Sequence, residues 1–71
     1  MPFVEIFKTN VIEPEMANLL VGMLNTRLPG NRINFDLSDC DKILRIEGGN
    51  IIPEIVIETL VSAGYCCEIL E

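Results

Sequence analysis

Sulfur-bearing side chains are the residues of this chain whose types favour a definite chemistry. Cys40 lies in the polar run SDCDK, and Cys66 and Cys67 are adjacent near the end of the sequence. Two thiolates suffice to hold a soft ion such as Cu(I), and Zn(II) also accepts sulfur ligands. One hypothesis is therefore a soft-metal site, or a redox pair, formed by Cys40 with Cys66 or Cys67. The alternative is that Cys67 is a small buried hydrophobe and the other two cysteines are incidental.

Glu13 and Met16 form a second candidate pair at the start of a predicted helix. Residues three apart can share one side of the first helical turn, so a weak carboxylate and thioether site is one interpretation. The structural interpretation is that Glu13 stabilises the positive end of the helix dipole while Met16 fills a gap in the core. We expect the structural roles, because both residue types suit these positions without any ligand.

The remaining polar side chains fit structural roles better than catalytic ones. The chain has no histidine, which is the commonest general base and a common metal ligand. Tyr65 follows a helix-ending glycine, and we expect its ring to pack over the loop before the first helix. Asp36, Asp39 and Asp41 surround a predicted turn that lacks the late bidentate Glu of a calcium loop, so they are expected to be turn carboxylates. We therefore predict no enzymatic activity.

Charge and length restrict the partners and the size of the protein. Five Lys and Arg against eleven Asp and Glu give a net charge of −6. Phosphate contacts need clustered cations, so we predict no binding to nucleic acid or to acidic membrane surfaces. A chain of 71 residues predicts a single domain, residues 1–71. The sequence has no basic leader, no apolar stretch long enough to span a bilayer and an odd number of cysteines, and we expect a small acidic cytoplasmic protein.

Hydrophobic periodicity predicts the elements that position these residues. Residues 3–8, 32–39, 43–47 and 65–70 have strand patterns, while helices are expected to begin near Pro14 and Pro53. The order βαββαβ predicts an α+β, ferredoxin-like sandwich with a four-stranded antiparallel sheet, strand order 4-1-3-2, and two helices on one face. This topology brings the loop before the first helix, the hairpin around Cys40 and the segment before the last strand to one end of the sheet.

The sheet face away from the helices is a candidate interface. Alternation along the first strand places Val4 and Ile6 on one face and Phe3 and Phe7 on the other, and we expect Phe3 and Phe7 on the open face with Ile43 and Arg45. An open antiparallel face is normally polar, so apolar side chains there indicate association. We predict a protein partner or a homodimer through this face.

Two segments resemble the heavy-metal-associated domain family, which includes small copper chaperones. LPGNRINFDL, residues 28–37, is similar to the family's turn and strand after the first helix, and VIETLVSAGY, residues 56–65, is similar to its second helix. The resemblance covers residues 3–70 and implies the ferredoxin-like fold. It also aligns the family's Cys-x-x-Cys metal pair with Glu13 and Met16, neither of which is cysteine. A carboxylate and a thioether cannot replace two thiolates in binding Cu(I) with comparable affinity.

Two functional hypotheses follow from these residues. The preferred one is a small non-catalytic binding or interaction module on a heavy-metal-associated-like fold that has lost its metal cysteines and binds no cofactor. The alternative is a metallochaperone-like protein that binds Cu(I) or Zn through Cys40 with Cys66 or Cys67. The two hypotheses differ in whether the reduced protein binds metal.

Overall fold

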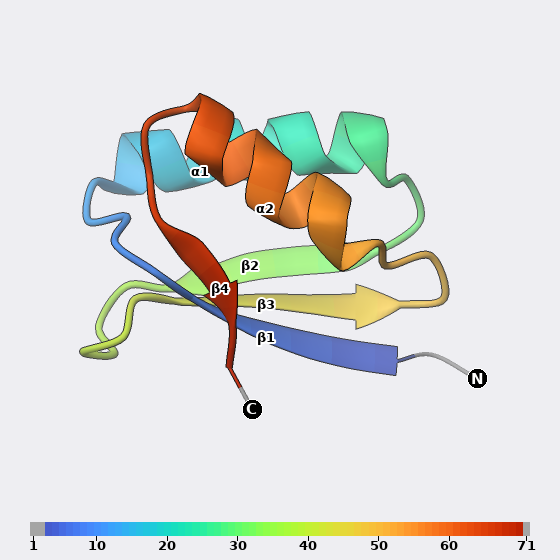
Figure 1. Ribbon diagram of the computed structural model, residues 1–71, viewed down its shortest axis with the longest axis horizontal. Helices are drawn as coiled ribbons and strands as arrows, with labels where there is room; N and C mark the ends of the chain where they lie inside the picture. The colour runs from blue at the N-terminus through green and yellow to red at the C-terminus, as the bar shows by residue number, and fades with distance from the viewer. Residues whose placement is uncertain (1–2, 71) are drawn as a thin grey trace.

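The computed structural model of the protein describes residues 3–70 and contains four strands and two helices. These elements are β1 (Phe3–Thr9), α1 (Pro14–Arg27), β2 (Arg32–Asp36), β3 (Ile43–Gly48), α2 (Pro53–Ser62) and β4 (Cys67–Ile69). The sheet is antiparallel with the order β2-β3-β1-β4, which is the predicted order 4-1-3-2 in reverse. Both helices cover one face of the sheet (Figure 1). The predicted α+β, ferredoxin-like arrangement is confirmed.

Proline begins both helices. Pro14 and Pro53 occupy the first turn, where the missing N–H costs nothing because it would have no partner within the helix. A glutamate follows each proline and lies at the positive end of the helix dipole. The second helix ends at Ser62 with Ala63 as its C-cap, and Gly64 follows with a φ of 94° that glycine adopts at little cost. The local sequence therefore determines where each helix begins and how the second one stops.

The core lies between the helices and the covered face of the sheet. Its fully buried members come from both layers and are Phe7, Val11, Leu20, Leu24, Leu44, Ile46, Val56 and Leu60. Phe7 on β1 pairs with Leu44 on the central strand β3, so both side chains point toward the helices. This packing supplies most of the stabilisation available to a domain of this size, because burial of apolar area is the dominant favourable term in folding.

Asn31 ties two loops together at one end of the sheet. Its side-chain amide donates to the carbonyl oxygens of Leu28 (3.1 Å) and Asn50 (2.7 Å), and its Oδ1 accepts from the backbone N–H of Asn50 at 3.4 Å. Gly48 lies directly against this side chain, and a Cβ at position 48 would overlap Asn31 Oδ1. The buried amide thus holds the exit of α1 next to the loop that leads into α2.

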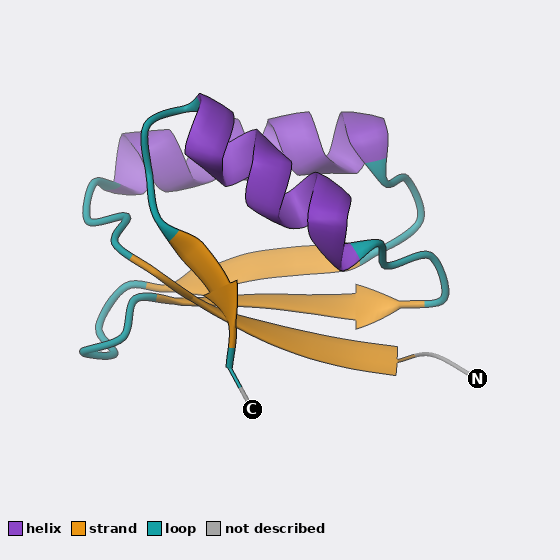
Figure 2. Cartoon of the chain, in the orientation of Figure 1, coloured by secondary structure: helices purple, strands orange, loops and turns teal. Residues whose placement is uncertain are grey.

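Three connections meet at the other end of the sheet (Figure 2). Thr9 joins two of them, because its N–H donates to the carbonyl of Asp41 (3.1 Å) and its hydroxyl donates to the carbonyl of Lys42 (2.6 Å). Asn10 joins the third by accepting a 2.8 Å hydrogen bond from the N–H of Cys66. Cys66 thus bonds to a side chain just before β4, which spans Cys67–Ile69 and is shorter than the predicted strand over 65–70.

Candidate functional site

Glu13 and Met16 have separate structural roles. Glu13 is the N-cap residue of α1, but its side chain makes no bond to the helix N–H groups. Its carboxylate instead accepts a 3.2 Å hydrogen bond from the Tyr65 hydroxyl. Loss of solvation, followed by the charge of Glu13 and this hydrogen bond, raises the pKa of Tyr65 above 10.0. Met16 is half-buried and packs against the core. Glu13 therefore joins the loop before α1 to Tyr65, and Met16 contributes to core packing.

Strand β1 lies between the hairpin that carries Cys40 and the strand that carries Cys67. Thr9 bonds to the hairpin at Asp41 on one side and pairs with Cys67 on the other. Two strand spacings amount to about 9.6 Å. A disulfide needs Cα atoms roughly 4.4–6.8 Å apart. The hairpin that carries the exposed Cys40 and the strand that carries Cys67 therefore contact opposite sides of β1, an arrangement that disfavours a disulfide between these two residues.

Cys67 is also poorly suited to form a thiolate. It is half-buried at the start of β4 and faces the same side of the sheet as Thr9. Burial, with a smaller contribution from the charge of Glu68, raises the pKa of Cys67 to about 11. A thiol with that pKa is almost fully protonated at neutral pH, whereas metal ligation and nucleophilic attack need the thiolate. Cys66 is exposed, and its N–H is held by Asn10.

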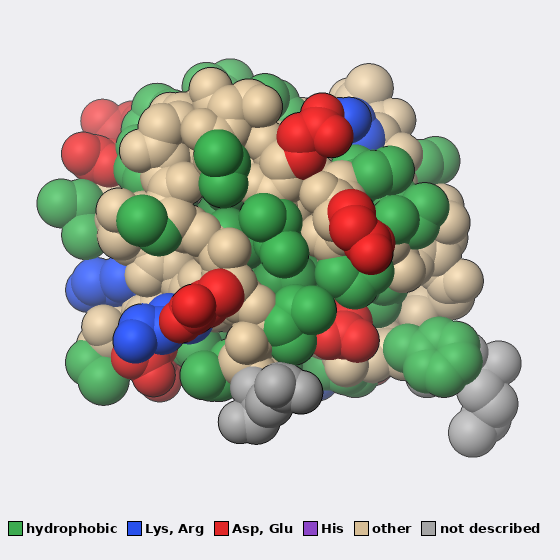
Figure 3. Space-filling view, viewed as in Figure 1, with side chains coloured by type: hydrophobic (Ala, Val, Ile, Leu, Met, Phe, Trp, Pro, Cys, Tyr) green, Lys and Arg blue, Asp and Glu red, His purple; other side chains and the backbone are tan. Residues whose placement is uncertain are grey.

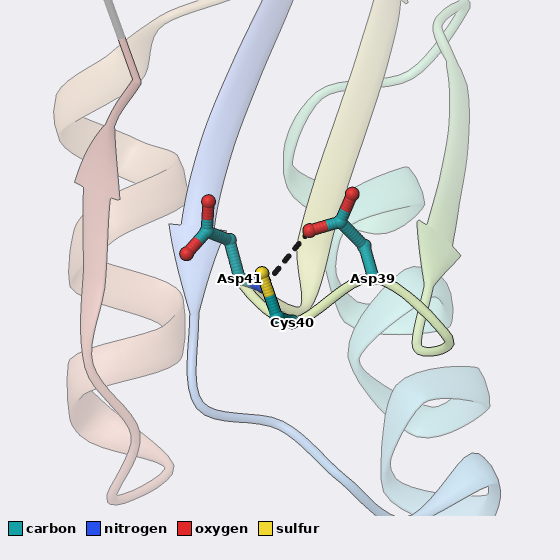
Figure 4. Close-up of side chains that lie close together, drawn as sticks. All are labelled: Asp39, Cys40 and Asp41. Carbon is teal, nitrogen blue, oxygen red and sulfur yellow. Dashed lines mark hydrogen bonds between the residues drawn. The ribbon is translucent and has the colours of Figure 1, made fainter.

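Asp39, Cys40 and Asp41 bring their potential ligand atoms within 4.8 Å of one another, and no other three-residue group of this kind occurs within residues 3–70 (Figure 4). Their carboxylates already have local partners. Asp39 accepts the N–H of Asp41 at 2.8 Å, and Asp41 lies 3.8 Å from the Lys8 ammonium. Asp36 accepts from the Ser38 hydroxyl at 2.7 Å, and this hydrogen bond is the main cause of its lowered pKa. These contacts are those of turn-forming carboxylates, as expected.

The prediction that Phe7 lies on the open face is wrong. Phe7 is 0% exposed and belongs to the core, and Val4 and Ile6 face the opposite side of the sheet. Both faces of this strand carry apolar residues, so alternation alone does not choose between them. In the structure, Phe7 is opposite Leu44 on β3, and both side chains are buried beneath the helices. Phe3 is exposed, but it lies four residues before Phe7 and therefore faces the helix side of the sheet as well.

The open face nevertheless carries an apolar patch, which consists of Val4, Ile6, Ile43 and Leu70. Val4 and Ile6 are two residues apart on β1, and the N–H of Leu70 donates to the carbonyl of Ile6 at 2.9 Å. Ile43 is opposite Lys8 and therefore diagonal to Ile6. Neither helix covers this face (Figure 1). The predicted placement of Ile43 and Arg45 on the open face agrees with the register of β3.

A depression lies beside this patch, and the sequence pattern did not predict that its lining residues would be neighbours. Its volume is about 390 Å³, and its lining, called here the arginine depression, is Arg32, Ile33, Asn34, Arg45 and Glu47. Asn34 is opposite Arg45, and Arg32 is opposite Glu47. The alternation of RINFD places Arg32 and Asn34 on the open face. Their alignment with Arg45 depends on the register between β2 and β3, which the sequence pattern does not specify.

Comparison with models of known protein families, with curated proteins and with solved structures gives no match for this chain. Within residues 3–70, neither helix has the length and apolar character needed to cross a membrane. The fold and the surface together define a small α+β domain of ferredoxin-like topology, with one open sheet face that combines apolar side chains and arginines.

Proposed function

We propose that this protein is a small non-catalytic interaction module, built on a heavy-metal-associated-like fold without the metal cysteines, that binds through its open sheet face. The occupant is a protein partner or a second copy of the chain. The apolar patch on a sheet face without a helical cover is the observation that carries the proposal. The solvent-facing side of an antiparallel sheet normally carries polar residues, so neighbouring apolar side chains on that side favour association.

Exposed apolar residues elsewhere on the molecule give weaker support for an interface. Hydrophobic side chains also reach the surface around the helices, with acidic ones among them (Figure 3). Leu19 and Met23 of α1 are 57% and 40% exposed, which is ordinary for single surface residues. The patch differs because β1, β3 and the residue after β4 contribute to it and charged side chains surround it, an arrangement typical of an interface core with a polar rim.

The chemistry of the site region favours binding over catalysis. The chain has no histidine, and the thiol of Cys67 is protonated at neutral pH because of its raised pKa. The two exposed cysteines are free thiols, which favours a reducing compartment, and we place the protein in the cytoplasm. Binding without chemistry is the simplest use of an open face that exposes no nucleophile next to a base.

Site-specific photocrosslinking tests this function in the cell. A photoreactive residue replaces Ile6 in the patch, and a matched variant carries it at the exposed Asn18 of α1. We expect discrete crosslinked products from position 6, either to another protein or to a second copy, that disappear when Ile43→Asp is added. Products of equal yield from both positions, or none from position 6, would contradict the proposal. Sedimentation of the purified chain at tens of micromolar then separates self-association from binding to another protein.

A further inference from the structure

Three of the five Lys and Arg side chains make an ion pair or a hydrogen bond within the protein. Lys8 lies 3.8 Å from Asp41, Arg27 lies 3.1 Å from Glu58, and Lys42 donates a 2.9 Å hydrogen bond to the carbonyl of Leu37. Among the described residues, no hydrogen bond or ion pair engages the guanidinium of Arg32 or Arg45. These two are the arginines of the arginine depression. The cations without partners are therefore gathered at one place on the open face.

The register of the sheet sets the spacing of the two arginines. Arg32 is opposite Glu47, and Arg45 is two residues before Glu47 on the same strand, so the arginines are diagonal neighbours. Such neighbours lie about 7–8 Å apart along the sheet. Asn34 stands opposite Arg45 and adds an amide that can donate hydrogen bonds. Each guanidinium presents a planar fork of donors that matches a carboxylate in two parallel hydrogen bonds.

We propose that the arginine depression binds the carboxylates of an acidic segment of a protein partner, with Arg32 and Arg45 as the recognition residues. This inference rests on the proposed function, since it names the chemistry of the partner that the open face takes. Ile6 is the direct neighbour of Arg45 on the other side, so the apolar patch begins where the depression ends. A segment with aliphatic residues next to Asp or Glu therefore complements both parts of the face.

Charge distribution favours a short acidic segment over an extended polyanion. The open face holds three of the five basic residues, yet it also holds Asp36, Glu47 and Glu68. The net charge of −6 repels a long phosphate backbone, which needs many cations in a row. One or two carboxylates can be neutralised locally by two arginines, while Glu47 remains available to accept a backbone N–H from the bound segment. The open face thus favours a segment that carries one or two carboxylates next to aliphatic residues.

Selection of a random 12-residue peptide library, displayed on phage, against the full chain tests this inference. We expect the selected peptides to carry Asp or Glu next to aliphatic residues. The Arg32→Gln/Arg45→Gln variant should weaken binding of a selected peptide at least tenfold. Arg27→Gln changes the charge by a single unit on the helix layer and should change the affinity less than twofold. Replacement of the peptide's acidic residues by Asn and Gln should match the loss in the double variant.

Amide shift mapping of the labelled protein distinguishes the possible outcomes. Peptides without acidic residues that shift Ile6 and Ile43 would overturn this inference and leave the proposed interaction function in place. Failure of every peptide to perturb the open face would overturn both. Displacement of the peptide by millimolar inorganic phosphate, with phosphate shifting Arg32 and Arg45 equally strongly alone, would assign the depression to a small anion and also overturn the acidic-segment proposal.

Discussion

Truncation of Phe7 tests which side of β1 enters the core. The side chain is fully buried and stands opposite Leu44 in the central pair of strands. Replacing a buried Phe by Ala removes its transfer free energy and leaves a cavity, at a cost of about 3–5 kcal/mol. Full burial places Phe7→Ala in the upper part of that range. Since a 71-residue domain has roughly 4–11 kcal/mol of unfolding free energy, this variant should lose a large share of its stability.

Urea unfolding followed by circular dichroism measures this loss. Ile6→Ala, the neighbouring position on the open face, is the matched control and should cost about 1 kcal/mol, because its side chain is only half-buried. Phe7→Leu provides a variant that stays folded, with a loss of about 1–2 kcal/mol and a melting temperature about 4–15 °C lower. If Ile6→Ala costs as much as Phe7→Ala, the assignment of the two faces of β1 is wrong.

Three further predictions concern Asn31 and the cysteines. Asn31→Ala removes one buried and two partly buried hydrogen bonds and should lower the unfolding free energy by about 2–3 kcal/mol, while Asn34→Ala, at an exposed position, should change it by less than about 0.5 kcal/mol. In a Cys40→Ser/Cys66→Ser variant, iodoacetamide should alkylate Cys67 at pH 8 roughly ten times more slowly than a thiol of pKa 9.0, because the smaller thiolate fraction outweighs the greater nucleophilicity of the thiolate, and equal rates would refute its raised pKa of about 11. Competitive titration of the reduced protein should detect no stoichiometric Cu(I) or Zn(II) at micromolar metal; a one-to-one complex that Cys40→Ser abolishes would show that β1 does not keep the sulfurs apart.

Short-range sequence features were sufficient to predict the fold, because each helix and strand contains residues that indicate its type and limits. Prolines at the helix starts, Gly64 after α2 and the alternation of RINFD are short-range features, and short connections leave few arrangements for their order. The length of β4 was not predictable from its residues. The strand begins next to the hydrogen bond from Cys66 to Asn10, a contact between residues 56 positions apart in the chain.

The candidate sites were less predictable, since they depend on register. The strand FVEIFK has apolar residues on both faces, so the sequence alone gave no reason to bury Phe7 rather than Val4 and Ile6. Likewise, alternation exposes Arg32, but only pairing with β3 sets it diagonal to Arg45. In each case a shift of one residue would reverse the faces, and the choice is made by side chains of another strand.

The amino-acid sequence by itself determined the order of elements and the positions of the helix starts. Tertiary structure decided that β1 lies between the hairpin that carries Cys40 and the strand that carries Cys67, and it assembled the surface on the open face. The physical reason is the sequence separation of the interacting residues. Helix starts and turns depend on neighbours within a few residues, whereas the face and spacing of strand side chains depend on pairing and core packing between distant segments.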